Sequence, residues 1–273
     1  MRPCGDWKSR ALPLLAAFLA VLLAAAALSE MLLPAAGKKT KSKDGLTLDI
    51  SHADQGYVMA KAAKSKKRLK LRVKVEDHTL NYDLNTEGEY EVFPLQYGDG
   101  KYTFTLYKNV SGKKYAEEGK ISLTVSLADP NLPFLYPNQY VNYNADTLCV
   151  QEAEKICGGM ADQRQIYETV CDYVSTHFAY DYIKSVSVKT GTMPDLDGAW
   201  EKHMGICQDL SAITVAMLRS QGVPAKMEIG NLNGTVYHAW VTAVVNGEDE
   251  FFDPTAAINA VNKDAMYTLE RYY

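Results

Sequence analysis

The stretch GICQDLSAITVAMLRSQGVP, residues 205–224, decides the interpretation of this sequence. Its apolar residues recur at helical spacing from Gln208 to Ser220, and Gly222 and Pro224 end the pattern. Cys207 directly precedes this predicted helix. Unpaired backbone N–H groups and the positive end of a helix dipole stabilise a thiolate at that position, and the thiolate is the nucleophilic form of cysteine. The stretch therefore predicts either a reactive thiol or a buried structural cysteine.

A strong hairpin signal follows in the same half of the chain. Asn246-Gly247 lies between apolar runs, which is typical of a two-residue β-turn. With such a turn, Asp253 lies opposite Trp240, and His238 becomes its diagonal neighbour on the same face, at roughly 7–8 Å between backbones. A three-residue loop would place His238 and Asp253 on opposite faces. The two-residue turn predicts that their side chains meet.

Cys207, His238 and Asp253 together match the requirements of thiol catalysis. A histidine activates the cysteine, and a carboxylate holds the histidine in the useful tautomer. Each residue alone has a simpler explanation: a buried cysteine, a histidine satisfied by a neighbour, and a turn aspartate before proline. Their combination predicts a Cys-His-Asp triad.

Four ordered motifs resemble the transglutaminase-like superfamily, in its exported bacterial branch. They are WEKHMGICQD at 200–209, LRSQGVPAK at 218–226, YHAW at 237–240 and FDPT at 252–255. With the preceding helix and FAYDY at 178–182, the resemblance spans roughly residues 135–260. It implies a papain-like core, with Cys207 as nucleophile, His238 as general base and acid, and Asp253 as the residue that orients the histidine.

The resemblance also implies acyl transfer. Cys207 attacks a carboxamide or peptide carbonyl, His238 protonates the leaving amine, and water or an amine resolves the thioester. One oxyanion donor is the backbone N–H of Cys207. Further oxyanion or substrate-lining candidates, each also explained as a packing or helix residue, are Tyr180, Tyr182, Trp200, Gln208 and Trp240. Scattered histidines and the lack of a Cys-x-x-Cys pair predict no metal and no cofactor.

The first half of the chain is strand-like. LKLRVKVE alternates apolar and charged residues from Leu69, as a half-buried strand does, and further such runs follow Gly and Asn turns. Residues 46–128 therefore predict a small all-β, immunoglobulin-like sandwich. The proline-rich segment 128–138 marks a boundary, and 135–273 form the predicted catalytic domain, with helices before the sheet. The predicted fold class is α+β, with a papain-like transglutaminase core after the sandwich.

The N-terminus predicts export. Basic residues precede an uncharged apolar run from Ala11 to Leu28, so residues 1–36 are either a secretory signal peptide or a membrane anchor. Residues 37–45 are rich in lysine and are predicted to be a linker. The expected location is secreted, or extracytoplasmic and membrane-anchored through residues 11–28.

Two functions from different classes fit this sequence. The first is an exported cysteine acyltransferase or hydrolase acting on protein or peptide substrates, with a cell-wall substrate as one option. Hydrolysis is favoured over crosslinking, because crosslinking needs an acceptor channel that excludes water. The second is a non-catalytic binding or adhesion module of the cell envelope that uses the papain-like domain as a scaffold. The net charge of -4 gives no support to nucleic acid as a partner.

The cysteines leave a third interpretation open. Exported proteins commonly form disulfides, and an even number of cysteines follows the apolar run. Their pairing does not follow from the sequence. If Cys207 belongs to a disulfide, the thiol is not catalytic; if it is catalytic, at most one bridge forms among Cys149, Cys157 and Cys171.

Overall fold

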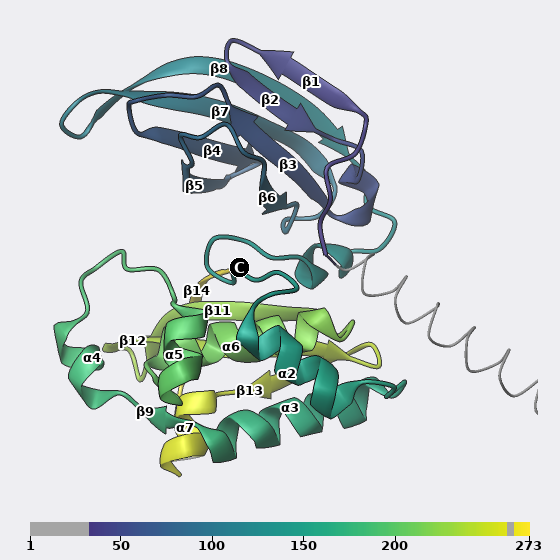
Figure 1. Ribbon diagram of the computed structural model, residues 1–273, viewed down its shortest axis with the longest axis vertical. Helices are drawn as coiled ribbons and strands as arrows, with labels where there is room; N and C mark the ends of the chain where they lie inside the picture. Colours follow the sequence, from purple (N-terminus) through teal and green to yellow (C-terminus); the bar gives the residue numbers. More distant parts are fainter. Residues whose placement is uncertain (1–32, 261–264) are drawn as a thin grey trace, which may run out of the picture.

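The computed structural model describes residues 33–260 and 265–273. Of the predicted signal peptide or anchor at 1–36, residues 1–32, which include the apolar run 11–28, lie outside these residues. Among the helices that the structure describes, none is both long and apolar enough to cross a bilayer. Figure 1 shows a β-rich part followed by a part that mixes helices and strands, so the α+β class predicted from the sequence is confirmed.

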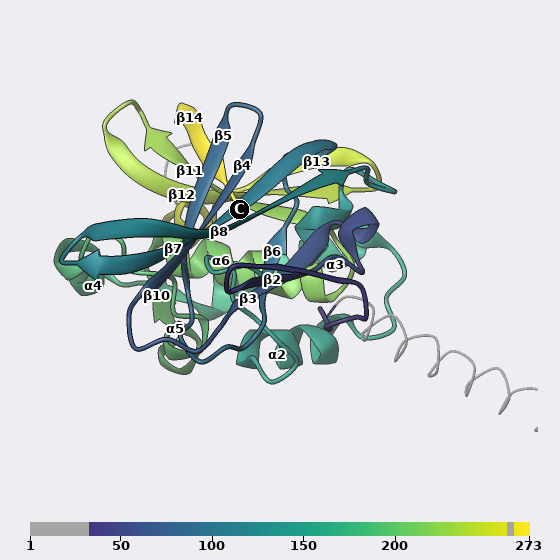
Figure 2. The ribbon, with the colours of Figure 1, turned by 90° about the horizontal axis from the view of Figure 1, so that it is seen from above.

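Two four-stranded antiparallel sheets make up the β-rich part, in the orders β1-β2-β3-β6 and β5-β4-β7-β8. In β4 the alternating residues from Leu69 to Val75 are buried, as the sequence pattern predicts. β7 and β8 form a long hairpin that Figure 2 shows from above. The strands are β1 (Thr40–Lys43), β2 (Leu46–Asp49), β3 (Tyr57–Ala62), β4 (Leu69–Val75), β5 (His78–Leu84), β6 (Glu91–Pro94), β7 (Gly100–Ser111) and β8 (Lys114–Val125).

The strand order differs from that of the immunoglobulin constant fold, in which the first strand's sheet also contains the fourth and fifth strands. Here that sheet contains the third and sixth strands instead. The structure therefore establishes two antiparallel sheets around a shared apolar core, and the immunoglobulin-like assignment stays a prediction.

The segment 37–45 differs from the linker predicted for it. Thr40–Lys43 forms β1, which pairs antiparallel with β2. The backbone N–H of Ile50 donates to the carbonyl of Lys39 at 2.8 Å. The lysine side chains are exposed, which is common on edge strands because charge discourages pairing with other chains. Strand pairing is a contact distant in sequence, so composition alone indicated only a solvated segment.

The second part contains a four-stranded antiparallel sheet in the order β13-β12-β11-β14. Helix α6 packs against β11 and β12 and is buried along most of its length (Figure 1). The helices and strands of this second part are α2 (Leu148–Cys157), α3 (Gln163–His177), β9 (Ala179–Tyr180), α4 (Tyr182–Ser187), α5 (Leu196–Lys202), β10 (Met204–Gly205), α6 (Cys207–Ser220), β11 (Ala225–Leu232), β12 (Val236–Val245), β13 (Glu248–Phe252), α7 (Pro254–Asn259) and β14 (Tyr267–Tyr272).

A buried arginine fixes the C-terminal end of α6. The Arg219 guanidinium is fully buried and donates to the carbonyls of Ala225 at 2.8 Å, Tyr136 at 2.5 Å and Tyr273 at 2.9 Å. Burial lowers the pKa of Arg219 to about 10. These bonds join the helix to the segment before α2 and to the residue directly after β14, so the helix that begins at Cys207 has a rigid support.

Candidate active site

Cys207 is the first residue of α6, as the sequence pattern predicts to within one residue. Asp209 Oδ2 accepts the backbone N–H of Ile206 at 3.0 Å, which closes the first turn of the helix. Most of α6 is buried, but Cys207 is partly exposed. Its thiol therefore lies at a rigid helix N-terminus with access to solvent, which is the environment expected of a reactive cysteine.

The hairpin has the predicted two-residue turn. Val245 pairs with Glu248 and Val241 with Phe252, so the predicted register holds up to the residue directly before Asp253. Both turn residues have positive φ, as this turn type requires. His238 Nε2 donates to Asp253 Oδ2 at 2.8 Å, and both side chains are buried. The structure thus brings together the two residues that the register argument placed on one face.

Asp253 has a hydrogen-bond donor at each of its acceptor positions. As the N-cap of α7, its Oδ1 accepts the backbone N–H groups of Thr255 at 2.9 Å and Ala256 at 3.1 Å. Its Oδ2 accepts from His238 and also from the Tyr267 hydroxyl at 2.8 Å. Burial alone would raise the pKa of the Asp253 carboxyl, but these donors and the charge of His238 hold it below its ordinary value.

His238 lies between Asp253 and Cys207. Burial disfavours its charged form, but hydrogen bonds to Asp253 and Cys207, and the negative charges of both, raise the pKa of His238 to about 9. The imidazole is therefore an imidazolium at neutral pH, with one ring nitrogen directed to the carboxylate. A cation beside a thiol stabilises the thiolate. The arrangement is chemically equipped for nucleophilic attack by sulfur and proton donation by the imidazolium.

Two of the predicted flanking aromatics lie close to these residues. Tyr180 on β9 is half-buried; burial and the charges of Cys207 and Asp253 raise the pKa of its phenol. Trp240 is buried, lies 6.3 Å from His238 between ring centroids, and donates through Nε1 to Glu228 at 2.6 Å. The charges of the site therefore act on the Tyr180 phenol, and Trp240 packs beside the histidine.

The other three candidates have different surroundings. Tyr182 is exposed, lies against Tyr180, and donates to Asn259 Oδ1 at 3.1 Å. Gln208 donates through Nε2 to the carbonyl of Thr192 at 3.1 Å, so its amide holds the segment before α5. The third, Trp200, stacks on Tyr173 and lies against the tilted rings of Phe178 and His203, which is the environment of a packing residue.

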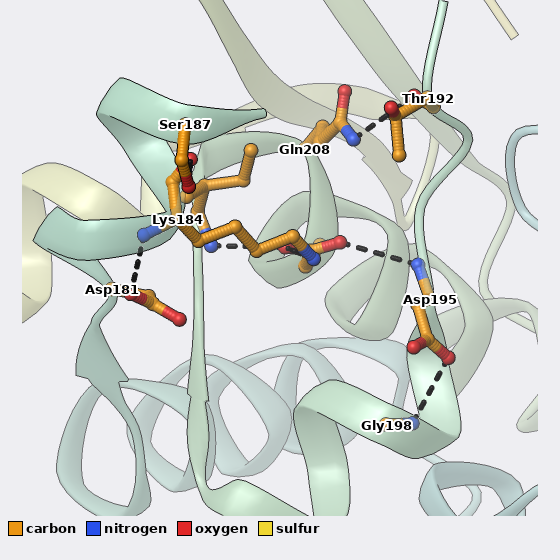
Figure 3. A network of polar contacts seen from close by, with 9 residues as sticks. Asp181, Lys184, Ser187, Thr192, Asp195, Gly198 and Gln208 are labelled. Carbon is orange, nitrogen blue, oxygen red and sulfur yellow. Dashed lines mark hydrogen bonds and ion pairs between the residues drawn. The ribbon is translucent and has the colours of Figure 1, made fainter. Parts of the chain in front are cut away.

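A buried ion pair beside Cys207 was not predicted. Asp209 is fully buried, and its Oδ2 accepts from Lys184 Nζ of α4 at 2.7 Å. Its Oδ1 accepts the backbone N–H of Asp195 at 3.2 Å. Figure 3 shows Lys184 and Asp195 approaching the start of α6 from opposite sides. An acidic residue at the third helical position was a usable sequence signal for the cap, whereas the lysine partner was not visible in the sequence.

The cysteines are free thiols throughout the described part of the chain. Burial raises the pKa of Cys149 to about 12, of Cys157 to about 11 and of Cys171 to about 12. The structure therefore contains none of the disulfides that the cysteine count permitted. Cys207 is set apart from the other three because its side chain is the only one of the four that is not buried.

One family model matches a segment of this chain. Residues 151–252 match the family model of the transglutaminase-like superfamily. No curated protein matches the chain. Similar solved structures include a candidate cysteine protease from Cytophaga hutchinsonii, with 17% identity, 77% of this chain and 80% of that chain covered, and a TM-score of 0.39.

Two further structures show a similar level of likeness. The periplasmic domain of TgpA from Pseudomonas aeruginosa has 13% identity over 82% of this chain and 76% of that chain, with a TM-score of 0.38. Red sea bream transglutaminase has 11% identity over 73% of this chain and 48% of that chain, with a TM-score of 0.30. These scores are low, so the assignment rests on the family model: the segment 151–252, which contains Cys207 and His238 and ends directly before Asp253, belongs to the transglutaminase-like superfamily.

Proposed function

We propose that this chain is an exported, cysteine-dependent acyl-transfer enzyme that forms a thioester with a carboxamide or peptide carbonyl of a protein or peptide. The observation that carries the proposal is the buried His238–Asp253 pair, at 2.8 Å, together with the partly exposed thiol of Cys207 at the start of α6, whose charge helps to raise the pKa of His238. A thiol, a base and an orienting carboxylate in this order form a nucleophilic site.

The first half-reaction forms the thioester. Cys207 Sγ, as thiolate, attacks the carbonyl carbon, and the carbonyl oxygen gains negative charge. The backbone N–H of Cys207, at the positive end of α6, is the proposed donor to that oxyanion. The C–N bond then breaks as His238 transfers its proton to the leaving amine. Asp253 holds the imidazole in place and balances its charge throughout.

The second half-reaction resolves the thioester. His238, now neutral, accepts a proton from water or from an amine as that nucleophile attacks the acyl carbon, and the C–S bond breaks to regenerate the thiolate–imidazolium pair. Hydrolysis is the proposed outcome. The partly exposed position of Cys207 supports this choice because it gives water access to the acyl-enzyme.

The proposed setting is outside the cytoplasm. The basic start and apolar run of residues 1–28 support export by a signal peptide or an anchor. The β-rich residues 46–128 are proposed to form a separate domain beside the catalytic residues 135–273. A cell-wall-associated protein or peptide is the proposed substrate class.

Alkylation of the full chain with iodoacetamide across a pH series tests the proposal, with mass spectrometry to locate each label. We expect Cys207 to be modified rapidly below pH 7, and more slowly in His238→Ala, because the imidazolium stabilises the thiolate. Cys149, Cys157 and Cys171 serve as internal controls, since burial protects them. Rapid labelling would justify a screen of peptide and glutamine donors.

The opposite outcome has a defined meaning. If Cys207 reacts no faster than an ordinary exposed thiol and His238→Ala changes nothing, the enzyme proposal fails. The non-catalytic binding module of the cell envelope is then the better account of a transglutaminase-like scaffold, because fold membership alone does not establish activity.

A further inference from the structure

Tyr267 connects the two opposite edges of the sheet that carries the site. It is the first residue of β14, which is one edge of the order β13-β12-β11-β14. Its hydroxyl donates at 2.8 Å to Oδ2 of Asp253, which directly follows the strand at the other edge. This is the same carboxylate oxygen that accepts from His238.

The Tyr267 ring is held in place along its length. Its centroid lies 5.1 Å from Trp240, 4.8 Å from Phe251 and 6.2 Å from His238. Burial and the neighbouring Asp253 raise the pKa of the Tyr267 phenol, so the hydroxyl remains a protonated donor while His238 titrates. The tyrosine is therefore fixed as a donor to the carboxylate.

The backbone also brings β14 close to the site. Gly230 on β11 lies opposite both His238 and Leu269, where the β11–β14 register shifts. A Cβ at Gly230 would lie 2.0 Å from the carbonyl oxygen of Thr268. Only glycine allows this approach, and Thr268 directly follows Tyr267 in the strand.

We infer that Tyr267 is a positioning residue of the acyl-transfer site, which acts through Asp253 to hold the His238 imidazolium in place and to keep it acidic enough to donate its proton. This inference rests on the proposed function. It lies beyond the family match, because Tyr267 and all of β14 follow residue 252.

The reason is competition for one carboxylate oxygen. When His238 is neutral, Asp253 keeps its full negative charge and the Tyr267 hydroxyl stabilises it strongly. When His238 is charged, the imidazolium already compensates that charge and the hydroxyl contributes less. Tyr267 therefore favours the neutral form of His238 relative to a site without the hydroxyl. Removing the hydroxyl makes the imidazolium a weaker acid.

Other groups around this pair are few and identifiable. The charge of Cys207 of α6 acts on His238, and the charges of Cys207 and Asp253 act on Tyr180 of β9. The backbone N–H groups of Thr255 and Ala256 of α7 hold the other oxygen of Asp253. None of these contacts involves the Tyr267 hydroxyl, so we expect them to persist when that hydroxyl alone is removed.

The experiment is a nitrogen-15 NMR titration of His238 in the full chain, with Tyr267→Phe and Tyr272→Phe compared with the wild type and His238→Gln used for assignment. Tyr272 lies on the same strand, but its hydroxyl donates to Gln96, away from the site. We expect the His238 midpoint to rise by roughly half a unit in Tyr267→Phe and to stay unchanged in Tyr272→Phe. Introducing 3-fluorotyrosine at position 267, a stronger donor, should lower it.

The outcomes separate this inference from the proposed function. An unchanged or lowered His238 midpoint in a folded Tyr267→Phe overturns the inference and leaves only a packing role for the ring. If that variant fails to fold, the fluorotyrosine series decides, because it keeps the ring and changes only the donor. The titration needs no substrate, so failure of the alkylation test overturns the proposed function without altering the NMR result. Once a substrate is known, Tyr267→Phe should shift the alkaline limb of the pH profile of kcat/KM to higher pH and leave KM unchanged.

Discussion

Lys184 Nζ lies 2.7 Å from Asp209 Oδ2, and this ion pair joins α4 to the first turn of α6 directly beside Cys207. The Asp209 carboxylate is fully buried, whereas the lysine keeps limited contact with solvent. Lys184 therefore compensates the negative charge of the Asp209 carboxylate, which also accepts the backbone N–H groups of Ile206 and Asp195. The nucleophile is held by a network centred two residues further along its own helix.

Lys184→Met should destabilise the protein by about 1.5–3 kcal/mol, because it removes a charge-assisted hydrogen bond from a buried carboxylate. Urea denaturation measures the free energy of unfolding, and alkylation of Cys207 reports the start of the helix in the same variant. Lys70→Met is the matched control: it breaks the exposed pair with Asp83 and should cost less than about 1 kcal/mol. Equal effects of the two changes would contradict a special role for the buried pair.

Asp253→Asn should abolish most activity while it preserves the fold. Asparagine is a good N-cap, so α7 keeps its first turn. With its oxygen on the helix, the asparagine presents amide N–H groups to His238 Nε2, and these do not accept a hydrogen bond from it. The imidazole thus loses its orienting partner, and we expect kcat to fall about 10³–10⁴-fold. Cys207 alkylation and turnover measure the effect, with thermal unfolding as the check on folding. Asp253→Ala should additionally lower stability by about 1 kcal/mol through the lost cap.

The stability of the protein should depend on pH through His238. Its pKa rises from 6.5 to about 9 on folding. The stabilisation is therefore fully present below pH 6.5, the value in the unfolded chain, and is lost as the pH rises through about 9. It amounts to about 3 kcal/mol. Urea denaturation at pH 6, 7.5 and 9.5 should show this decline in the wild type, and a curve for His238→Gln that is just as steep would refute it.

The sequence was most informative where the determinants are local. The Asn246-Gly247 turn fixes the register of its two strands, so the meeting of His238 and Asp253 followed from counting along the hairpin. The helix after Cys207 was predicted from periodicity and its stop signals. The pairing of β1 with β2 was missed because the lysines of residues 37–45 report solvent exposure and not strand partners.

Two neighbours of the site were out of reach of such reasoning. Tyr267 reaches Asp253 from the opposite edge of the sheet, so its position depends on the strand order β13-β12-β11-β14, which no local pattern encodes. Lys184 reaches Asp209 from α4, a short helix whose ion pair with α6 is likewise a contact between residues distant in the sequence. The sequence thus predicted the three residues of the proposed triad, and missed Tyr267 and Lys184, which bond to Asp253 and Asp209.

Gly230→Ala should reproduce the effect of losing the Tyr267 hydroxyl while it leaves that hydroxyl in the protein. The new Cβ would lie 2.0 Å from the carbonyl oxygen of Thr268 and 3.0 Å from the Trp240 ring, so β14 must move away from β11. Such overpacking costs about 1–3 kcal/mol. The displaced strand carries Tyr267 away from Asp253, so the His238 midpoint should rise in NMR titration as it does in Tyr267→Phe. The double variant should show no further rise, because both changes remove the same hydrogen bond; an additive rise would mean that Gly230 affects His238 by another route.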